Sequence, residues 1–113
     1  MKWLRPQTTA RVGLRPHRTL EVPRALADAY DCALVQLEAA LGANVAVDDR
    51  PGRFIEAGFG VINNERVRIT FDPIDAARTS VRIEAFFRAG AAVPQRSAAV
   101  EALAAAILRA TAA

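Results

Sequence analysis

The sequence predicts an α+β domain in which an antiparallel sheet of about five strands carries two helices on one face. Alternating apolar and polar residues between positions 53 and 88 predict three consecutive antiparallel strands with one apolar face. Residues 23–41 and 95–110 flank this meander and carry apolar side chains at helical spacing. A sheet with one apolar face has to be covered, and these two helices supply the cover.

The first half of the chain predicts a strand, a helix and a second strand. Residues 17–22 alternate as a short strand, and the helix of residues 23–41 follows. Gly42 suits the left-handed conformation that often follows a helix end. Residues 44–47 predict the second strand, and residues 48–52 are a strong turn signal. The apolar stripe of the helix consists of Leu26, Ala29, Tyr30, Ala33, Leu37, Ala40 and Leu41.

The loop between the strands predicted at residues 53–61 and 66–71 decides which residues pair. A two-residue loop would place Phe59 beside Arg68, an apolar residue against a charged one. A three-residue loop at residues 63–65 instead pairs apolar residues: Phe59 with Ile69, Val61 with Val67, and Ala57 with Phe71. Because a slip of one residue turns every side chain to the other face, the three-residue loop is favoured.

The last part of the chain predicts a longer connection over residues 72–77, a strand over residues 79–87 and the C-terminal helix. The first strand is expected to pair with the last strand of the meander, which gives the order 1-5-4-3-2. The buried stripe of the C-terminal helix is predicted to be Val100, Leu103, Ala104, Ile107 and Leu108.

Length and composition predict one domain. A chain of 113 residues, 52% of them hydrophobic, can hold a single core without disulfides or metal. Residues 1–16 are expected to be a basic N-terminal arm or an edge strand, and residues 17–113 a single domain. The first residues lack the apolar region of a signal peptide, and no segment predicts a membrane span, so a cytoplasmic protein is expected.

Few residues are available for catalysis. His17 is the single histidine and Cys32 the single cysteine, so a zinc site of the common ligand spacing cannot form. Asp48 and Asp49 are adjacent in a turn signal, where aspartates are usually turn formers. A non-catalytic protein without a cofactor is therefore expected.

The polar face of the sheet is one candidate site. Guanidinium groups beside two glycines would suit an anionic ligand or a partner carboxylate. The favoured alternative is that the glycines let the sheet bend and that the charges form opposite-sign pairs. Two phenylalanines on the same face suggest an apolar patch for a homodimer. The residues of this face are Phe54, Gly58, Gly60, Arg66, Arg68, Arg82, Glu84 and Phe86.

The space between the sheet and the helices is a second candidate site, for a small apolar ligand. A filled core is the stronger expectation at this chain length, because protein interiors pack tightly. The predicted lining is Leu26, Tyr30, Phe59, Ile69, Phe71, Ile83, Phe87, Leu103 and Ile107.

The N-terminal arm differs from the rest of the chain in charge. Residues 1–24 contain six basic residues and one acidic residue, whereas the remainder contains nine basic and eleven acidic residues. Such an arm can bind nucleic acid, which is an alternative function here, although charge patterns alone are weak signals. Trp3, between Lys2 and Arg5, could equally anchor the arm onto the body of the domain.

The order of strand, helix, four-strand meander and long C-terminal helix resembles the helix-grip architecture of the START-like, polyketide-cyclase and aromatase superfamily. The segments that carry the resemblance are RTLEVPRALADAYDCAL, VDDRPGRFIEAGF and VRITFDP. It covers residues 18–110 and implies a site for an apolar ligand between the sheet and the C-terminal helix. The chain has two fewer strands than that superfamily and lacks a second helix after the first. The first functional expectation is thus a non-catalytic module that binds a small apolar or amphipathic ligand.

Overall fold

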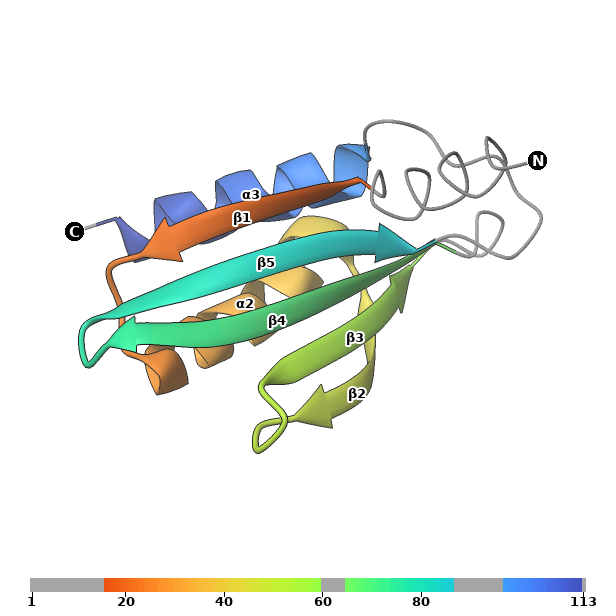
Figure 1. Ribbon diagram of the computed structural model, residues 1–113. Helices are drawn as coiled ribbons and strands as arrows, with labels where there is room; N and C mark the ends of the chain where they lie inside the picture. Colours follow the sequence, from red (N-terminus) through yellow and green to blue (C-terminus); the bar gives the residue numbers. More distant parts are fainter. Residues whose placement is uncertain (1–15, 60–64, 87–96, 113) are drawn as a thin grey trace, which may run out of the picture.

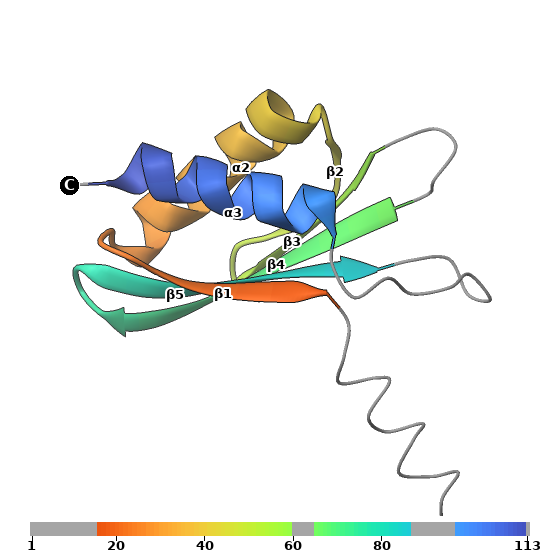
Figure 2. The ribbon, with the colours of Figure 1, turned by 90° about the horizontal axis from the view of Figure 1, so that it is seen from above.

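The computed structural model describes residues 16–59, 65–86 and 97–112. The strands in these ranges form one antiparallel sheet in the order β1-β5-β4-β3-β2, as predicted. Figures 1 and 2 show both helices on the same face of the sheet, which confirms the α+β prediction. The elements are β1 (His17–Val22), α2 (Leu26–Leu41), β2 (Asn44–Asp49), β3 (Phe54–Phe59), β4 (Glu65–Asp75), β5 (Arg78–Phe86) and α3 (Ala98–Thr111).

Helix α2 ends as the sequence predicts and begins slightly later. Gly42 has a φ of 61°, and its N–H donates to the Glu38 carbonyl oxygen at 2.9 Å. Ala25 takes the N-cap position in an extended conformation, so the helix starts three residues after Pro23. Ala40 was predicted to be buried but is exposed in the last turn. The fully buried side chains of α2 are Ala29, Tyr30, Ala33 and Leu37.

The pairing of β3 with β4 differs from the prediction. Phe59 faces Glu65 instead of Ile69, and Ala57 faces Val67 instead of Phe71. Because Glu65 already belongs to β4, the three-residue loop was wrong; the connection spans residues 60–64, which lie outside the described ranges. The strands are displaced by an even number of residues, so the same side chains still face the core. The alternation of apolar residues fixes the face, but it leaves registers that differ by two residues equivalent.

The connection between β4 and β5 is shorter than predicted. β4 continues to Asp75, which faces Arg78 across a turn at Ala76 and Ala77. The Asp75 carboxylate accepts hydrogen bonds from the Ala77 N–H at 2.8 Å and from Arg78 Nε at 2.9 Å. Pro73 lies within β4 and is accommodated by a shift in register between Pro73 and Asp75.

Helix α3 is fixed at its start by a serine. Ser97 Oγ accepts a hydrogen bond from the Val100 N–H at 3.2 Å and donates to Glu65 Oε2 at 2.6 Å. This cap ties the helix to the start of β4 and places its first residue later than the predicted position 95. Leu108 was predicted to be buried but is 41% exposed, whereas Thr111 is buried and donates to the Ile107 carbonyl oxygen.

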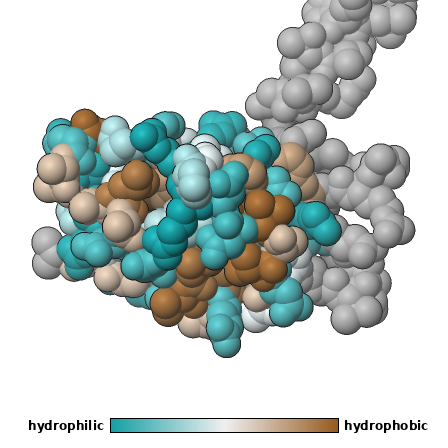
Figure 3. Space-filling model, turned by 90° about the horizontal axis from the view of Figure 1, so that it is seen from below, coloured by the Kyte–Doolittle hydropathy of each residue, from teal (hydrophilic) through white to brown (hydrophobic). Residues whose placement is uncertain are grey.

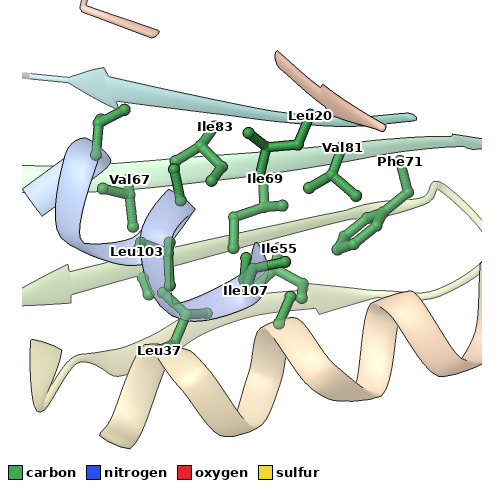
Figure 4. Close-up of a cluster of buried hydrophobic side chains, with 14 of the residues drawn as sticks. Leu20, Leu37, Ile55, Val67, Ile69, Phe71, Val81, Ile83, Leu103 and Ile107 are labelled. Carbon is green, nitrogen blue, oxygen red and sulfur yellow. The ribbon is translucent and has the colours of Figure 1, made fainter. Parts of the chain in front are cut away.

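The core lies between the inner face of the sheet and the two helices (Figure 4). Every strand except the edge strand β2 contributes fully buried side chains, and the helices contribute the remainder. Its largest side chains with almost no exposure are Phe71, Leu37, Ile55, Ile69, Ile83, Leu103 and Ile107. A single continuous core of this kind holds the sheet and both helices as one unit.

Candidate functional site

Among the described residues, side chains pack tightly in the predicted ligand space beneath α3. Figure 4 shows Leu103 and Ile107 of α3 pointing toward Ile69 and Ile83 of the sheet. A void large enough for water would leave its lining side chains partly exposed, and these four are at most 1% exposed. Tyr30 and Phe71 are also buried, while the side chains of Phe59 and Phe87 lie outside the described part of the chain. A ligand among the described side chains would have to displace packed groups.

A hollow of about 170 Å³ lies elsewhere, where the first turn of α2 meets the turn between β2 and β3. It is lined by Leu26, Ala27, Tyr30 and Arg50, and it opens to solvent. We call this site the α2 corner. Figure 3 views the molecule from the side of β2 and shows apolar patches among polar ones on this surface. The hollow is smaller than a site for a drug-sized ligand, so its size suits a group of one or two rings.

Tyr30 forms the inner wall of the α2 corner. Its ring lies 4.9 Å from the Phe71 ring, centroid to centroid, and 4.4 Å from the guanidinium carbon of Arg50. The hydroxyl donates to Asp48 Oδ1 and lies 3.3 Å from the Phe54 carbonyl oxygen. Burial, and then the bond to Asp48, raise the pKa of the Tyr30 phenol well above its usual value. The phenol therefore stays protonated at neutral pH and holds the wall in place.

Arg50 forms the mouth of the hollow. Its Nη2 donates to Asp31 Oδ1, and this bond raises the pKa of the Arg50 guanidinium. The side chains of Arg50 and Asp31 are 50% and 61% exposed, so water screens the pair and its partners can be exchanged at little cost. The sequence marked Arg50 only as part of a turn. No local pattern indicated that this turn folds back against the first turn of α2.

The outer face of the sheet carries ion pairs. Arg68 Nε lies 3.4 Å from Glu56, and the Arg68 guanidinium carbon lies 4.5 Å from the centroid of the Phe54 ring. Arg82 and Glu84 form a second pair at 3.5 Å. Arg68 Nε is buried and makes no hydrogen bond among the described residues, so its contact with Glu56 is an ion pair without a hydrogen bond. Two arginines of this face are therefore paired with carboxylates, one across the strands and one along a strand.

Gly58 does not mark a close approach of the backbone to another group. A Cβ atom built there would meet Arg66 Cγ at 3.9 Å, which is an ordinary contact. Gly60 lies outside the described residues. Phe86, like Phe54, is partly buried on this face. The described part of the outer face thus carries two ion pairs and two partly buried phenylalanines.

The chemistry available at these surfaces is limited. Among residues 16–59, 65–86 and 97–112, no three histidine, cysteine or carboxylate side chains are grouped closely enough to hold a metal ion. Burial raises the pKa of the Cys32 thiol, which disfavours the reactive thiolate. None of the helices in the described part of the chain is long and apolar enough to span a membrane.

Comparison with known proteins shows the fold. No protein-family model and no curated protein matches this chain. The di-domain aromatase/cyclase StfQ of the steffimycin biosynthetic pathway aligns with 84% of this chain at 14% identity and a TM-score of 0.55, and the chain spans only 44% of its length. The protein XoxI from Bacillus cereus aligns with 85% of this chain, over 95% of its own length, at 12% identity and a TM-score of 0.51. These alignments confirm, at the level of fold, the helix-grip resemblance seen in the sequence.

Proposed function

We propose that this chain is a non-catalytic binding module for a small amphipathic molecule with an aromatic body of one or two rings. The observation that carries the proposal is the α2 corner, whose apolar walls end at the guanidinium of Arg50. An aromatic ring can stack on a guanidinium plane and gain cation–π attraction there. Tyr30 already packs against Arg50 in this way. The fold similarity to an aromatase/cyclase supports a binding role without identifying a ligand.

The charges around the α2 corner favour a ligand whose polar end is neutral or cationic. Residues 26–49 contain five acidic residues and no lysine or arginine. Arg50 is already compensated by Asp31. An anionic ligand would therefore meet like charge around the hollow, whereas an amine would meet opposite charge.

Calorimetric titration with 2-naphthylmethylamine tests the proposal, with naphthalene-2-sulfonate as the matched anion. We expect the amine to bind the full chain and the sulfonate to bind at least about tenfold more weakly, which is ~1.4 kcal/mol. Ala27→Leu should abolish binding because the larger side chain fills the hollow. Ala39→Leu places the same side chain at another exposed site of α2 and should leave binding unchanged. Absence of binding, or equal loss in both variants, would contradict the proposal.

Two alternatives from the sequence remain predictions. A homodimer through the outer face would use Phe54 and Phe86, both partly buried there, and light scattering would detect it. Nucleic-acid binding by residues 1–16 would fall steeply with salt and disappear when the arm is removed.

A further inference from the structure

The fold places the acidic part of this chain along one side of the molecule. The stretch without lysine or arginine, residues 26–49, forms helix α2 and the edge strand β2. Residues 1–15 have the opposite character, with one lysine, three arginines and no acidic residue. The acidic residues of α2 and β2 are Asp28, Asp31, Glu38, Asp48 and Asp49.

Apolar side chains run along this acidic side. Tyr30, Leu34 and Leu41 share one stripe of α2 by their spacing of four and seven residues, and the Tyr30 hydroxyl reaches Asp48 of β2. Leu34 and Leu41 are only partly buried against the core. Val45 of β2 is 43% exposed although its neighbour on β3, Ala57, is fully buried. These residues form a seam between α2 and β2 that leads to the α2 corner, and we call it the α2–β2 seam.

Strand β2 is an edge of the sheet, with a neighbour on one side only among the described strands. Such an edge presents backbone N–H and C=O groups that an extended segment can pair with. The bulge between Val45 and Val47 interrupts this edge only at Ala46. The α2–β2 seam therefore offers backbone groups, apolar side chains and acidic groups along one line.

We propose that the N-terminal arm, residues 1–15 of the same chain, docks along the α2–β2 seam and places the Trp3 indole in the α2 corner. The arm is basic where the seam is acidic. Trp3 carries a two-ring side chain of the size that the hollow suits, and Lys2 and Arg5 beside it match the surrounding carboxylates.

Pro16, the first described residue, lies in the row of the sheet that contains Val45. The Pro16 carbonyl oxygen accepts a hydrogen bond from the Ala85 N–H at 2.9 Å. Ala85 faces Val67, Val67 faces Ala57, and Ala57 faces Val45. Pro16 and Val45 therefore lie at opposite ends of one row across the sheet. Four strand spacings separate them, about 19 Å.

The length of the arm is sufficient for this path. From Val45 the seam runs along β2 to Arg50, a further five residues or about 17 Å. The whole path of about 36 Å is shorter than the reach of the thirteen residues from Pro16 to Trp3, about 43 Å when extended. Docking within one chain is thus possible without a second copy.

Trp3 is the single tryptophan and reports directly on docking. Its emission maximum and its quenching by acrylamide are compared between the full chain and a peptide of residues 1–15. We expect the full chain to show blue-shifted emission and at least about threefold weaker quenching, because the indole is buried. Ala27→Leu should return both values to those of the peptide, whereas Ala39→Leu should not. Equal quenching in the full chain and the peptide would overturn the proposal.

The contribution of charge is tested at Glu38, which is exposed on α2. Glu38→Lys should raise the quenching of Trp3 toward the peptide value at low salt. Asp72→Lys makes the same charge change on β4, away from the seam, and should leave it unchanged. Equal effects of the two substitutions would mean that only net charge matters, which contradicts docking on the seam. Protection of Trp3 that grows with protein concentration would place the arm on a second copy and overturn docking within one chain.

Docking of the arm does not require a ligand, so the two proposals can fail separately. If 2-naphthylmethylamine binds while Trp3 is as accessible as in the peptide, the arm proposal fails and the ligand proposal stands. If Trp3 is protected but the amine binds neither the full chain nor Trp3→Ala, the ligand proposal fails and the arm proposal stands. If both hold, the amine should release Trp3 and raise its quenching.

Discussion

The interior beneath α3 and the α2 corner border the same sheet but are closed in different ways. Beneath α3, branched side chains of the helix and of the sheet, such as Leu103 and Ile83, pack against one another and are at most 1% exposed. At the α2 corner, helix α2 contributes Leu26, Ala27 and Tyr30, and the remaining lining residue is Arg50, whose charged group stays at the surface. A long cationic side chain covers apolar surface with its stem but does not fill the space behind it. The hollow found among the described residues therefore lies where a charged residue forms part of the wall.

The largest effect is expected beneath α3. Leu103→Ala should lower the free energy of unfolding by about 2–5 kcal/mol, because a fully buried side chain leaves a cavity. Leu108→Ala on the same helix should lower it by only about 0.5 kcal/mol, since Leu108 is 41% exposed. Urea unfolding of the two variants measures the difference. Similar losses of stability in the two variants would show that the interior beneath α3 is loosely packed, which would contradict the difference drawn between it and the α2 corner.

An intermediate effect is expected at the wall of the α2 corner. Tyr30→Phe removes the bond to Asp48 and should lower stability at neutral pH by about 1 kcal/mol. The pKa of Tyr30 is raised in the folded state, whereas the unfolded phenol ionises near pH 10. The stability from the protonated phenol is therefore fully present below about pH 10 and is lost as the pH rises above it.

The pH dependence of stability distinguishes the hydrogen bond of the Tyr30 phenol from the packing of its ring. Urea midpoints of the parent chain and of Tyr30→Phe at pH 8 and pH 11 give the measurement. The gap between the two proteins should narrow at pH 11, because only the parent loses the contribution of the Tyr30 phenol. A gap of constant size would contradict the buried hydrogen bond.

Substitution of two glycines by alanine is expected to change stability in opposite directions. Gly42→Ala should cost about 1 kcal/mol, because the φ of 61° that ends α2 disfavours a side chain. Gly58→Ala should instead raise stability by about 0.4–1 kcal/mol, since a Cβ atom fits there in ordinary contact. Thermal unfolding of both variants tests this. A large loss for Gly58→Ala would mean that the outer face needs a bare backbone at that position.

The smallest effect on stability is expected for filling the α2 corner. Ala27 is exposed, so Ala27→Leu should change the free energy of unfolding by no more than about 0.5 kcal/mol. The same substitution should nevertheless abolish amine binding. A large loss of stability would show that the hollow is too narrow for an added side chain. Unchanged stability with unchanged binding would mean that the amine binds at another site.

Much of the fold was predictable because it depends on patterns that repeat within a few residues. Alternation in β4 and β5 identified the core face, and Gly42 identified the end of α2. The register of β3 against β4 was not predictable, because Ala57 opposite Val67 buries apolar surface as well as Ala57 opposite Phe71. Long-range geometry, and not local pattern, decides between such alternatives.

The α2 corner was only partly visible in the sequence. Tyr30 was predicted to line a ligand site because it lies on the apolar stripe of α2. Arg50 was not, since a turn arginine carries no signal about the helix that it will meet. Leu108 shows the opposite error: helical spacing placed it in the buried stripe, but 41% of it is exposed.

The central claim is that a small aromatic ligand binds at the α2 corner and not among the described side chains beneath α3. Methyl and tyrosine-ring NMR spectra of the full chain, recorded while 2-naphthylmethylamine is added, test it in one experiment. We predict shifts in the Tyr30 ring and the Leu26 methyl signals, with those of Leu103, Ile107 and Ile83 unchanged. Shifts at Leu103, Ile107 and Ile83 with Tyr30 and Leu26 unmoved would contradict the account.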